Sequence, residues 1–275
     1  MKASRKVNKA IFKAAQVMLV LYALIGILLW TFQDKLLFQS TQLPSTYVYQ
    51  FKEPHKELVI RLNEKDNLSI VQFFPVDRSK IKGVILYFHG NKENINHYAE
   101  FVPQFTKYGY EVWMMDYPGY GKSTGVVKED RFYSDAFLLY KMAVQKFSSE
   151  KVVVYGKSLG TGVAAELASH VSCHQLILET PYYSISSLVS AYFPVYPAES
   201  MVQYKFPLYE YLQQVQEPVT IFHGTADEVI PYENARQLIS LLKSNDDFVT
   251  IEKGTHHNLS SFTLYQHKLD SLLAF

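Results

Sequence analysis

The pattern of hydrophobic and polar positions divides the chain into one apolar N-terminal run and a long region of short, alternating elements. Residues 14–32 carry no charge and are nearly all apolar, over about the length of a helix that spans a bilayer. Further on, the runs LVIRL and LSIVQFF flank the polar residues 63–67 and predict an antiparallel hairpin. Residues 83–88, GVILYF, form a continuous apolar run, which is typical of a strand buried on both faces.

The remainder repeats this alternation of apolar runs and amphipathic segments. Further strands are predicted at residues 111–115, 152–155, 175–178, 218–222 and 247–252. Helices are predicted at residues 96–108, 132–147, 160–170 and 233–242, and again at the C-terminus. Strands that alternate with helices at this spacing predict an α/β fold, in which helices cover both faces of a mostly parallel sheet.

These elements suggest four regions along the chain. We expect a basic tail over residues 1–13, a transmembrane anchor over 14–32 and a linker over 33–56. The α/β domain would then occupy residues 57–275. Within it, residues 182–211 are dense in Tyr and Phe, are interrupted by prolines and lack clear periodicity, so they are predicted to form an inserted lid.

The flanks of the apolar run favour one orientation in the membrane. Five basic residues precede the run on its short N-terminal side, which favours a cytoplasmic N-terminus and places the domain on the opposite, periplasmic or lumenal face. A cleavable signal peptide would have a shorter apolar region and small residues before a cleavage site, whereas this run ends near Trp30 and Phe32. A buried core helix is the other alternative, but the basic flank and the lack of polar positions count against it.

The charge and the cysteine content argue against nucleic-acid binding and against sites built from cysteines. The formal net charge is +1, and the five basic residues of the N-terminal tail leave the rest of the chain at about −4, so no basic surface for nucleic acid is implied. Cys173 is the only cysteine, which excludes an internal disulfide and a cysteine-built metal site.

The candidate chemistry centres on residues 151–165, KVVVYGKSLGTGVAA, where a β-rich run changes into a small-residue helix. Ser158 lies at the change. A sharp strand-to-helix turn exposes a serine hydroxyl and leaves the following amide, that of Leu159, free to bind an oxyanion. Gly156 and Gly160 are then required, because the turn brings them so close together that a side chain on either would clash.

The glycines around Ser158, and those at residues 119–121, do not complete a nucleotide-binding motif. Gly121-Lys122-Ser123 and Gly156-Lys157-Ser158 resemble the end of a phosphate-binding loop but lack its first glycine. The pattern at residues 160–165 fits a dinucleotide fingerprint, but its glycines fall inside the predicted helix and not at the end of the strand. We therefore expect no nucleotide, no other organic cofactor and no metal, and a nucleotide-dependent oxidoreductase is a weak third alternative.

We expect the base and the carboxylate that act with Ser158 to follow the ends of other strands, because reactive groups gather in loops at the carboxyl ends of parallel strands. Histidine is the side chain best suited to accept the serine proton near neutral pH, and a carboxylate can orient the imidazole. Asp227 directly follows a strand end, and His257 lies after the last strand. The order Ser158, Asp227, His257 is that of α/β-hydrolases.

The motifs HGN, DYPGYGKSTG, GKSLG, HGTADEVIP and GTHHN together resemble those of the BEM46-like serine hydrolases of the ABHD13 and ABHD17 types. This resemblance covers the chain from about Glu57 and implies an α/β-hydrolase fold and action on esters or thioesters. It also implies that Asn91 shares the oxyanion hole with Leu159 and that Lys157 matches the basic residue before the nucleophile. Alignment to G-x-x-H-N selects His257 as the catalytic histidine, with the adjacent His256 as the alternative.

The sequence thus predicts a membrane-anchored serine hydrolase that uses Ser158, Asp227 and His257 and forms an acyl-enzyme. Short esters, lipids, acyl thioesters and peptides all stay open as substrates. A membrane-tethered binding module that retains the fold without catalysis is the alternative from another class.

Overall fold

A computed structural model describes residues 2–274 and confirms the predicted α/β architecture. Its main sheet has the strand order β10-β9-β8-β7-β4-β6-β3-β2. Neighbouring strands from β10 to β6 run parallel, whereas β3 is antiparallel to both β6 and β2. The predicted hairpin is therefore the antiparallel edge of a mostly parallel sheet. The strands are β2 (His55–Arg61), β3 (Asn67–Phe73), β4 (Gly83–Phe88), β6 (Tyr110–Met115), β7 (Val152–Lys157), β8 (Gln175–Glu179), β9 (Val219–Gly224) and β10 (Asp247–Ile251).

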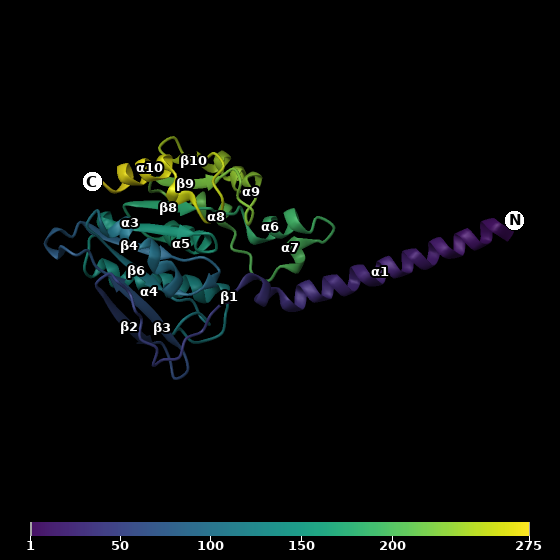
Figure 1. The fold of residues 1–275 in the computed structure, drawn as a ribbon, viewed down its shortest axis with the longest axis horizontal. Helices are drawn as coiled ribbons and strands as arrows, with labels where there is room; N and C mark the ends of the chain where they lie inside the picture. The colour runs from purple at the N-terminus through teal and green to yellow at the C-terminus, as the bar shows by residue number, and fades with distance from the viewer. Residues whose placement is uncertain (1, 275) are drawn as a thin grey trace.

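Helices cover both faces of this sheet (Figure 1). The α-helices are α1 (Lys2–Leu37), α2 (Ile95–Tyr98), α3 (Pro103–Thr106), α4 (Glu129–Val144), α5 (Gly160–His170), α6 (Ile185–Tyr192), α7 (Ala198–Met201), α8 (Leu208–Leu212), α9 (Tyr232–Arg236) and α10 (Thr263–Leu273). Short 3-10 turns occur at Arg78–Lys80, Ala99–Phe101, Ser149–Lys151, Gln237–Leu241 and Leu259–Ser261.

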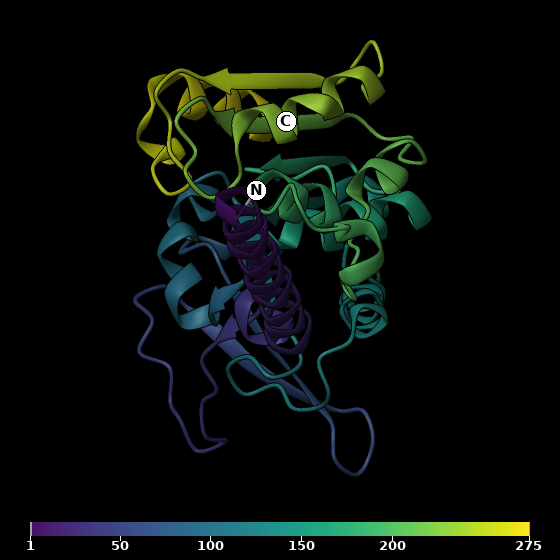
Figure 2. The ribbon, with the colours of Figure 1, turned by 90° about the vertical axis from the view of Figure 1, so that its right-hand side faces the viewer.

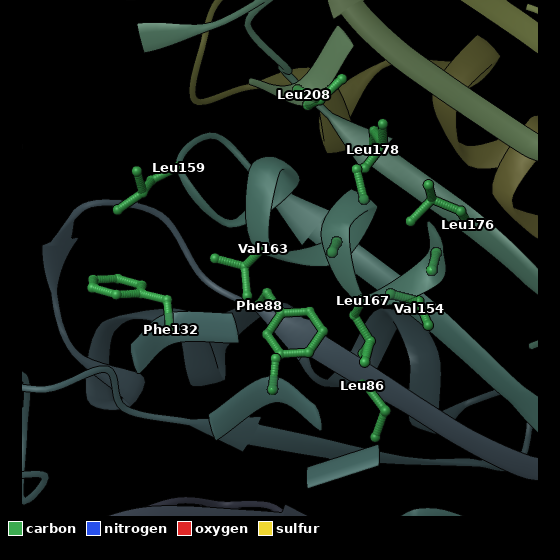
Figure 3. Close-up of a cluster of buried hydrophobic side chains, with 14 of the residues drawn as sticks. Leu86, Phe88, Phe132, Val154, Leu159, Val163, Leu167, Leu176, Leu178 and Leu208 are labelled. Atoms are coloured by element: carbon green, nitrogen blue, oxygen red, sulfur yellow. The ribbon is translucent and has the colours of Figure 1, made fainter. Parts of the chain in front are cut away.

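Alternate residues of the central strands supply two separate cores. In β7, Val152 and Val154 pack with α4, α5 and α8 on one face, whereas Val153 and Tyr155 pack with α2, α3 and α10 on the other. Figure 3 shows the first core, where Val163 of α5 lies over the strands. Because successive side chains of a strand point to opposite faces, a strand covered on both sides must be apolar throughout. This explains the continuous apolar runs in the sequence.

The helix predicted over residues 96–108 is broken into α2, a 3-10 turn and α3. Pro103 supplies the reason, because it has no N–H to donate and its ring clashes with the carbonyl four residues earlier in a continuous helix. The helix predicted over 233–242 is likewise short: α9 ends at Arg236 and continues as a 3-10 turn.

The N-terminal apolar run lies within the single long helix α1, which projects from the domain (Figure 1). Figure 2 looks roughly along α1 and shows it in front of the domain. The part of α1 from Lys6 to Leu37 is long and apolar enough to cross a membrane. Its most apolar stretch is not buried against the rest of the protein. An N-terminal signal sequence can have the same length and apolar composition.

The segment that follows α1 crosses the domain surface and enters its core. Phe38 and Tyr49 are buried, and the two-residue strand β1 (Gln39–Ser40) pairs in parallel with β5 (Lys92–Glu93). This pairing joins the end of α1 to the loop after β4, which is next to the candidate site.

Candidate active site

Ser158 occupies a strained turn between β7 and α5. Its φ angle is +51°, in the left-handed region that non-glycine residues seldom adopt. Such a conformation costs on the order of 1–3 kcal/mol and persists only where the surrounding structure enforces it. The Ser158 N–H donates to the carbonyl of Glu179 on the adjacent strand at 2.9 Å, and the residue is 7% exposed.

The two glycines beside Ser158 lie in the crowded positions that the sequence suggested. A Cβ on Gly156 would lie 2.5 Å from the carbonyl oxygen of Gly160. A Cβ on Gly160 would meet the carbonyl of Phe88 and would lie 2.6 Å from that of His89. These neighbours are backbone atoms of the turn and of the end of β4, so a side chain on either glycine would force the backbone apart.

His256 is the histidine that contacts Ser158. Its Nε2 lies 3.0 Å from Ser158 Oγ, while its Nδ1 lies 2.9 Å from Asp227 Oδ2 and 3.1 Å from Oδ1. When Nδ1 carries the proton, it donates to the carboxylate and leaves Nε2 free to accept from the serine hydroxyl. The ring is nearly buried, and the three side chains form one continuous hydrogen-bonded chain.

The prediction that His257 takes this place is corrected by the geometry. The His257 side chain is 61% exposed, and its Nε2 lies 3.9 Å from Glu228 Oε1, outside the chain of contacts to Ser158. The physical reason is the turn that carries both histidines. The Asn258 side chain accepts the N–H of Thr255 at 2.8 Å and closes this turn, within which the adjacent rings lie nearly perpendicular.

The motif G-x-x-H-N selected His257 because a motif gives the order of residues and not the direction of their side chains. The hydrogen bond from Thr255 N–H to the Asn258 side chain, which fixes that direction, is seen only in the structure.

Asp227 is held as a carboxylate. Burial by itself raises its pKa, but the hydrogen bond and charge of His256, the backbone N–H of Ile230 and the charge of His223 together outweigh burial, so the pKa lies below its ordinary value. The backbone N–H groups of Val229 and Ile230 also donate to Asp227 Oδ1, at 2.9 and 2.8 Å. The carboxylate is therefore ionised at neutral pH and can balance a positive charge on His256.

Asn91 and Leu159, the two residues predicted for the oxyanion hole, follow β4 and Ser158 respectively. Within residues 2–274, no acceptor takes the backbone N–H of either residue. The Asn91 carbonyl accepts from Gln39 N–H at 3.0 Å and from the Tyr120 hydroxyl at 2.9 Å. The Asn91 side chain donates to the carbonyl of Leu37 at 2.8 Å, so this loop is tied to the end of α1.

A cavity of about 210 Å³ gives access to the hydroxyl of Ser158. Its walls include Asn91, Tyr98, Phe101 and His256. Among residues 2–274, no group of three or more His, Cys, Asp or Glu side chains is arranged to hold a metal ion.

Directly before Ser158, Lys157 forms a buried ion pair with Glu179 and also lines the Ser158 cavity, and both residues of the pair are at most 5% exposed. The same carboxylate accepts from the hydroxyls of Tyr155 and, at 3.3 Å, Tyr265. Glu179 therefore acts here as a partner of buried side chains. Because the Glu179 backbone carbonyl also accepts Ser158 N–H, the network holds the strained turn in place.

Comparisons with known proteins find relatives in sequence and in fold. The family model Hydrolase_4, described as serine aminopeptidase, S33, matches residues 79–210. The alpha/beta hydrolase domain-containing protein 17C of Xenopus tropicalis is 26% identical over 193 residues, which cover 69% of this chain and 61% of that protein. The mouse protein of the same name is 25% identical over 193 residues and 59% of its length. The chain therefore aligns with about three fifths of these curated relatives.

Solved structures share the fold. An esterase from Pyrococcus furiosus superposes with a TM-score of 0.65 at 15% identity, over 86% of this chain and 96% of the esterase. A soluble variant of monoglyceride lipase from Saccharomyces cerevisiae gives a TM-score of 0.61 at 15% identity, over 84% of this chain and 97% of the lipase. The chain therefore shares the α/β fold of these two enzymes, with a serine at its strand-to-helix turn. In sequence, the chain is similar to the Hydrolase_4 family over residues 79–210 and to the ABHD17 type of alpha/beta hydrolase domain-containing proteins.

The crowding at Gly160 predicts a loss of stability in Gly160→Ala. The added methyl group must displace backbone at the end of β4, which should lower the free energy of unfolding by at least about 1–3 kcal/mol. Urea unfolding of the detergent-solubilised chain measures this loss. Ser134→Ala, on the exposed face of α4, is the control and should change stability by less than about 0.5 kcal/mol. Equal stability of the two variants would contradict the crowding.

The buried ion pair predicts that Lys157→Met destabilises the protein by about 3–5 kcal/mol, because the Glu179 carboxylate is left buried without its cation. Adding Glu179→Gln to that variant should restore part of the loss, since the unpaired charge is then removed. Arg236→Met is the matched control: it breaks an exposed pair with Glu233 and should cost at most about 1 kcal/mol. Additive losses in the double variant would show that Lys157 and Glu179 are not coupled.

Proposed function

We propose that this protein is a membrane-anchored serine hydrolase that cleaves carboxylic esters or thioesters. The observation that carries the proposal is the hydrogen-bonded chain from Ser158 through His256 to Asp227, placed at the strained turn. A binding module has no need of a serine hydroxyl held 3.0 Å from a buried imidazole whose other nitrogen contacts a carboxylate.

In the proposed reaction, Ser158 Oγ attacks the acyl carbonyl while His256 Nε2 takes its proton. Asp227 stabilises the imidazolium that forms and holds the ring in place. The backbone N–H groups of Asn91 and Leu159 donate to the oxygen of the tetrahedral intermediate. His256 then gives its proton to the leaving alcohol or thiol, and the acyl group stays on Ser158. A water molecule, deprotonated by His256, releases the acid and restores the serine.

The anchoring part of the proposal rests on α1. Between Lys13 and Asp34 the helix has no charged residue, a length of about 30 Å that matches the bilayer's hydrocarbon core. Basic residues at its N-terminal end favour a cytoplasmic N-terminus, which places the hydrolase domain on the opposite side of the membrane.

Turnover of a p-nitrophenyl ester by alanine variants tests the catalytic roles. Ser158→Ala and His256→Ala should each lower kcat by about 10³-fold or more, because each removes a group that moves the proton or forms the acyl bond. His257→Ala is the matched control, since it removes the neighbouring imidazole from the same turn, and its kcat should stay within about threefold of wild type. Thermal unfolding of each variant checks that the fold is intact.

Two results would contradict the proposal. A large loss in His257→Ala together with retained activity in His256→Ala would reject the assignment of the base. Absence of turnover by folded wild-type protein, over short and long acyl esters and thioesters, would favour the non-catalytic binding module.

A further inference from the structure

The C-terminal half of α1 is docked on the segment that follows α6. The rings of Tyr22 and Tyr196 are stacked with their centroids 4.6 Å apart, and each hydroxyl donates to a backbone carbonyl across the contact. Farther along, the Gln33 side chain accepts the N–H of Gln203 at 2.8 Å. Gly26 leaves room for the Tyr196 ring, whose nearest atom would lie 3.1 Å from a Cβ at that position. One face of the membrane helix is thus fixed to the domain.

A cavity of about 430 Å³ lies between this face of α1 and the helices α6 and α7, which sit beside the end of α1 in Figure 1. The α1 side supplies Leu29 and Leu36, and the opposite wall includes Val189, Phe193 and Met201. The walls are mainly aliphatic and aromatic, and the volume falls within the range of small-molecule sites. The cavity is therefore suited to an apolar chain.

This apolar cavity adjoins the cavity that contains Ser158. Asn91, Lys92 and Val229 line both. Asn91 is the candidate oxyanion residue, and Val229 donates its N–H to Asp227. An acyl group whose carbonyl lies against Ser158 would therefore have the apolar cavity beside it.

With α1 in the membrane as proposed, the cavity would lie near the membrane surface. The uncharged stretch of α1 ends just before Asp34, so Leu29 and Leu36 lie on either side of the boundary between hydrocarbon and water. Next to them, Tyr192, Phe193 and Val195 expose apolar side chains to the surroundings. Apolar groups gathered beside a membrane helix favour contact with the bilayer.

We propose that this cavity holds the fatty acyl chain of an ester drawn from the bilayer, and that the face of α1 at Leu29 sets the chain length that is accepted. The inference rests on the proposed hydrolase function. It gives the anchor helix a second role, as one wall of the substrate site. Leu29 is then a specificity-determining residue that lies in the predicted transmembrane segment.

The test compares Leu29→Trp with Leu28→Trp in the full-length chain reconstituted in phosphatidylcholine vesicles. Leu29 faces the cavity, whereas Leu28 is 54% exposed and does not line it. The two variants add the same side chain at almost the same depth, so membrane insertion and partitioning of substrate are matched. The substrates are the p-nitrophenyl esters of acetate, octanoate and palmitate.

Wild type and Leu28→Trp should gain in kcat/KM from acetate to octanoate, by up to about fourfold for each methylene that the cavity buries. Leu29→Trp should hydrolyse the acetate within about twofold of wild type, because Ser158 and its partners are unchanged. It should lose at least about tenfold on the longer esters, because the indole occupies their space. Val189→Trp, on the opposite wall, should give the same selective loss and covers the case in which Leu29→Trp does not fold.

Three outcomes would overturn the inference. Identical chain-length profiles for Leu28→Trp, Leu29→Trp and Val189→Trp would remove the cavity from the substrate site. Equal hydrolysis of acetate and octanoate by wild type would show that no acyl chain is bound there. Failure of wild type on every ester, acetate included, would instead reject the hydrolase proposal on which the inference rests.

Discussion

The left-handed backbone conformation at Ser158 is the constraint on which the site depends. β7 must end and α5 must begin within a few residues, and only a sharp turn allows both to keep their packing in the core. The turn is held from one side by the carbonyl of Glu179 and is closed by glycines that admit no side chain. Its conformational strain is balanced by the buried strands and helix around it, and the serine hydroxyl faces the loops that follow the other strands.

The same topology explains why residues far apart in the sequence meet at one place. Parallel strands end at a common edge, so the loops after β4, β7 and β9 bring Asn91, Ser158 and Asp227 together. His256 reaches them from the turn after β10. The ion pair of Lys157 with Glu179 joins β7 to the neighbouring strand β8 next to the turn. Position in the sheet, and not closeness in sequence, builds the hydrogen-bonded chain.

Much of this could be predicted from the sequence because the relevant signals are local. Runs such as residues 83–88 are apolar on both faces, and they became strands buried on both faces. The glycines around Ser158 identified the strand-to-helix turn in the same way. The error at His257 arose because two adjacent histidines carry the same chemistry, and only the backbone direction in the turn decides which one faces inward. Pro103 shows the same limit, since helical periodicity around it suggested one continuous helix.

The contact between α1 and the α6–α7 segment could not be predicted, because it depends on tertiary packing between residues more than 170 positions apart. The apolar residues of α1 look alike in sequence, whichever side of the helix they occupy. Only the structure separates the face at Leu29, which lines a cavity, from the face at Leu28, which does not. α1 and the α6–α7 segment thereby become parts of one apolar surface beside Ser158.

The central claim is that Ser158 is a nucleophile activated by His256. The most direct measurement is intact-protein mass spectrometry after exposure to a fluorophosphonate, followed by peptide mapping of the adduct. We predict a single adduct on the peptide that contains Ser158, formed rapidly in wild type and far more slowly in His256→Ala. No adduct on folded protein, or an adduct at a different serine, would contradict the account.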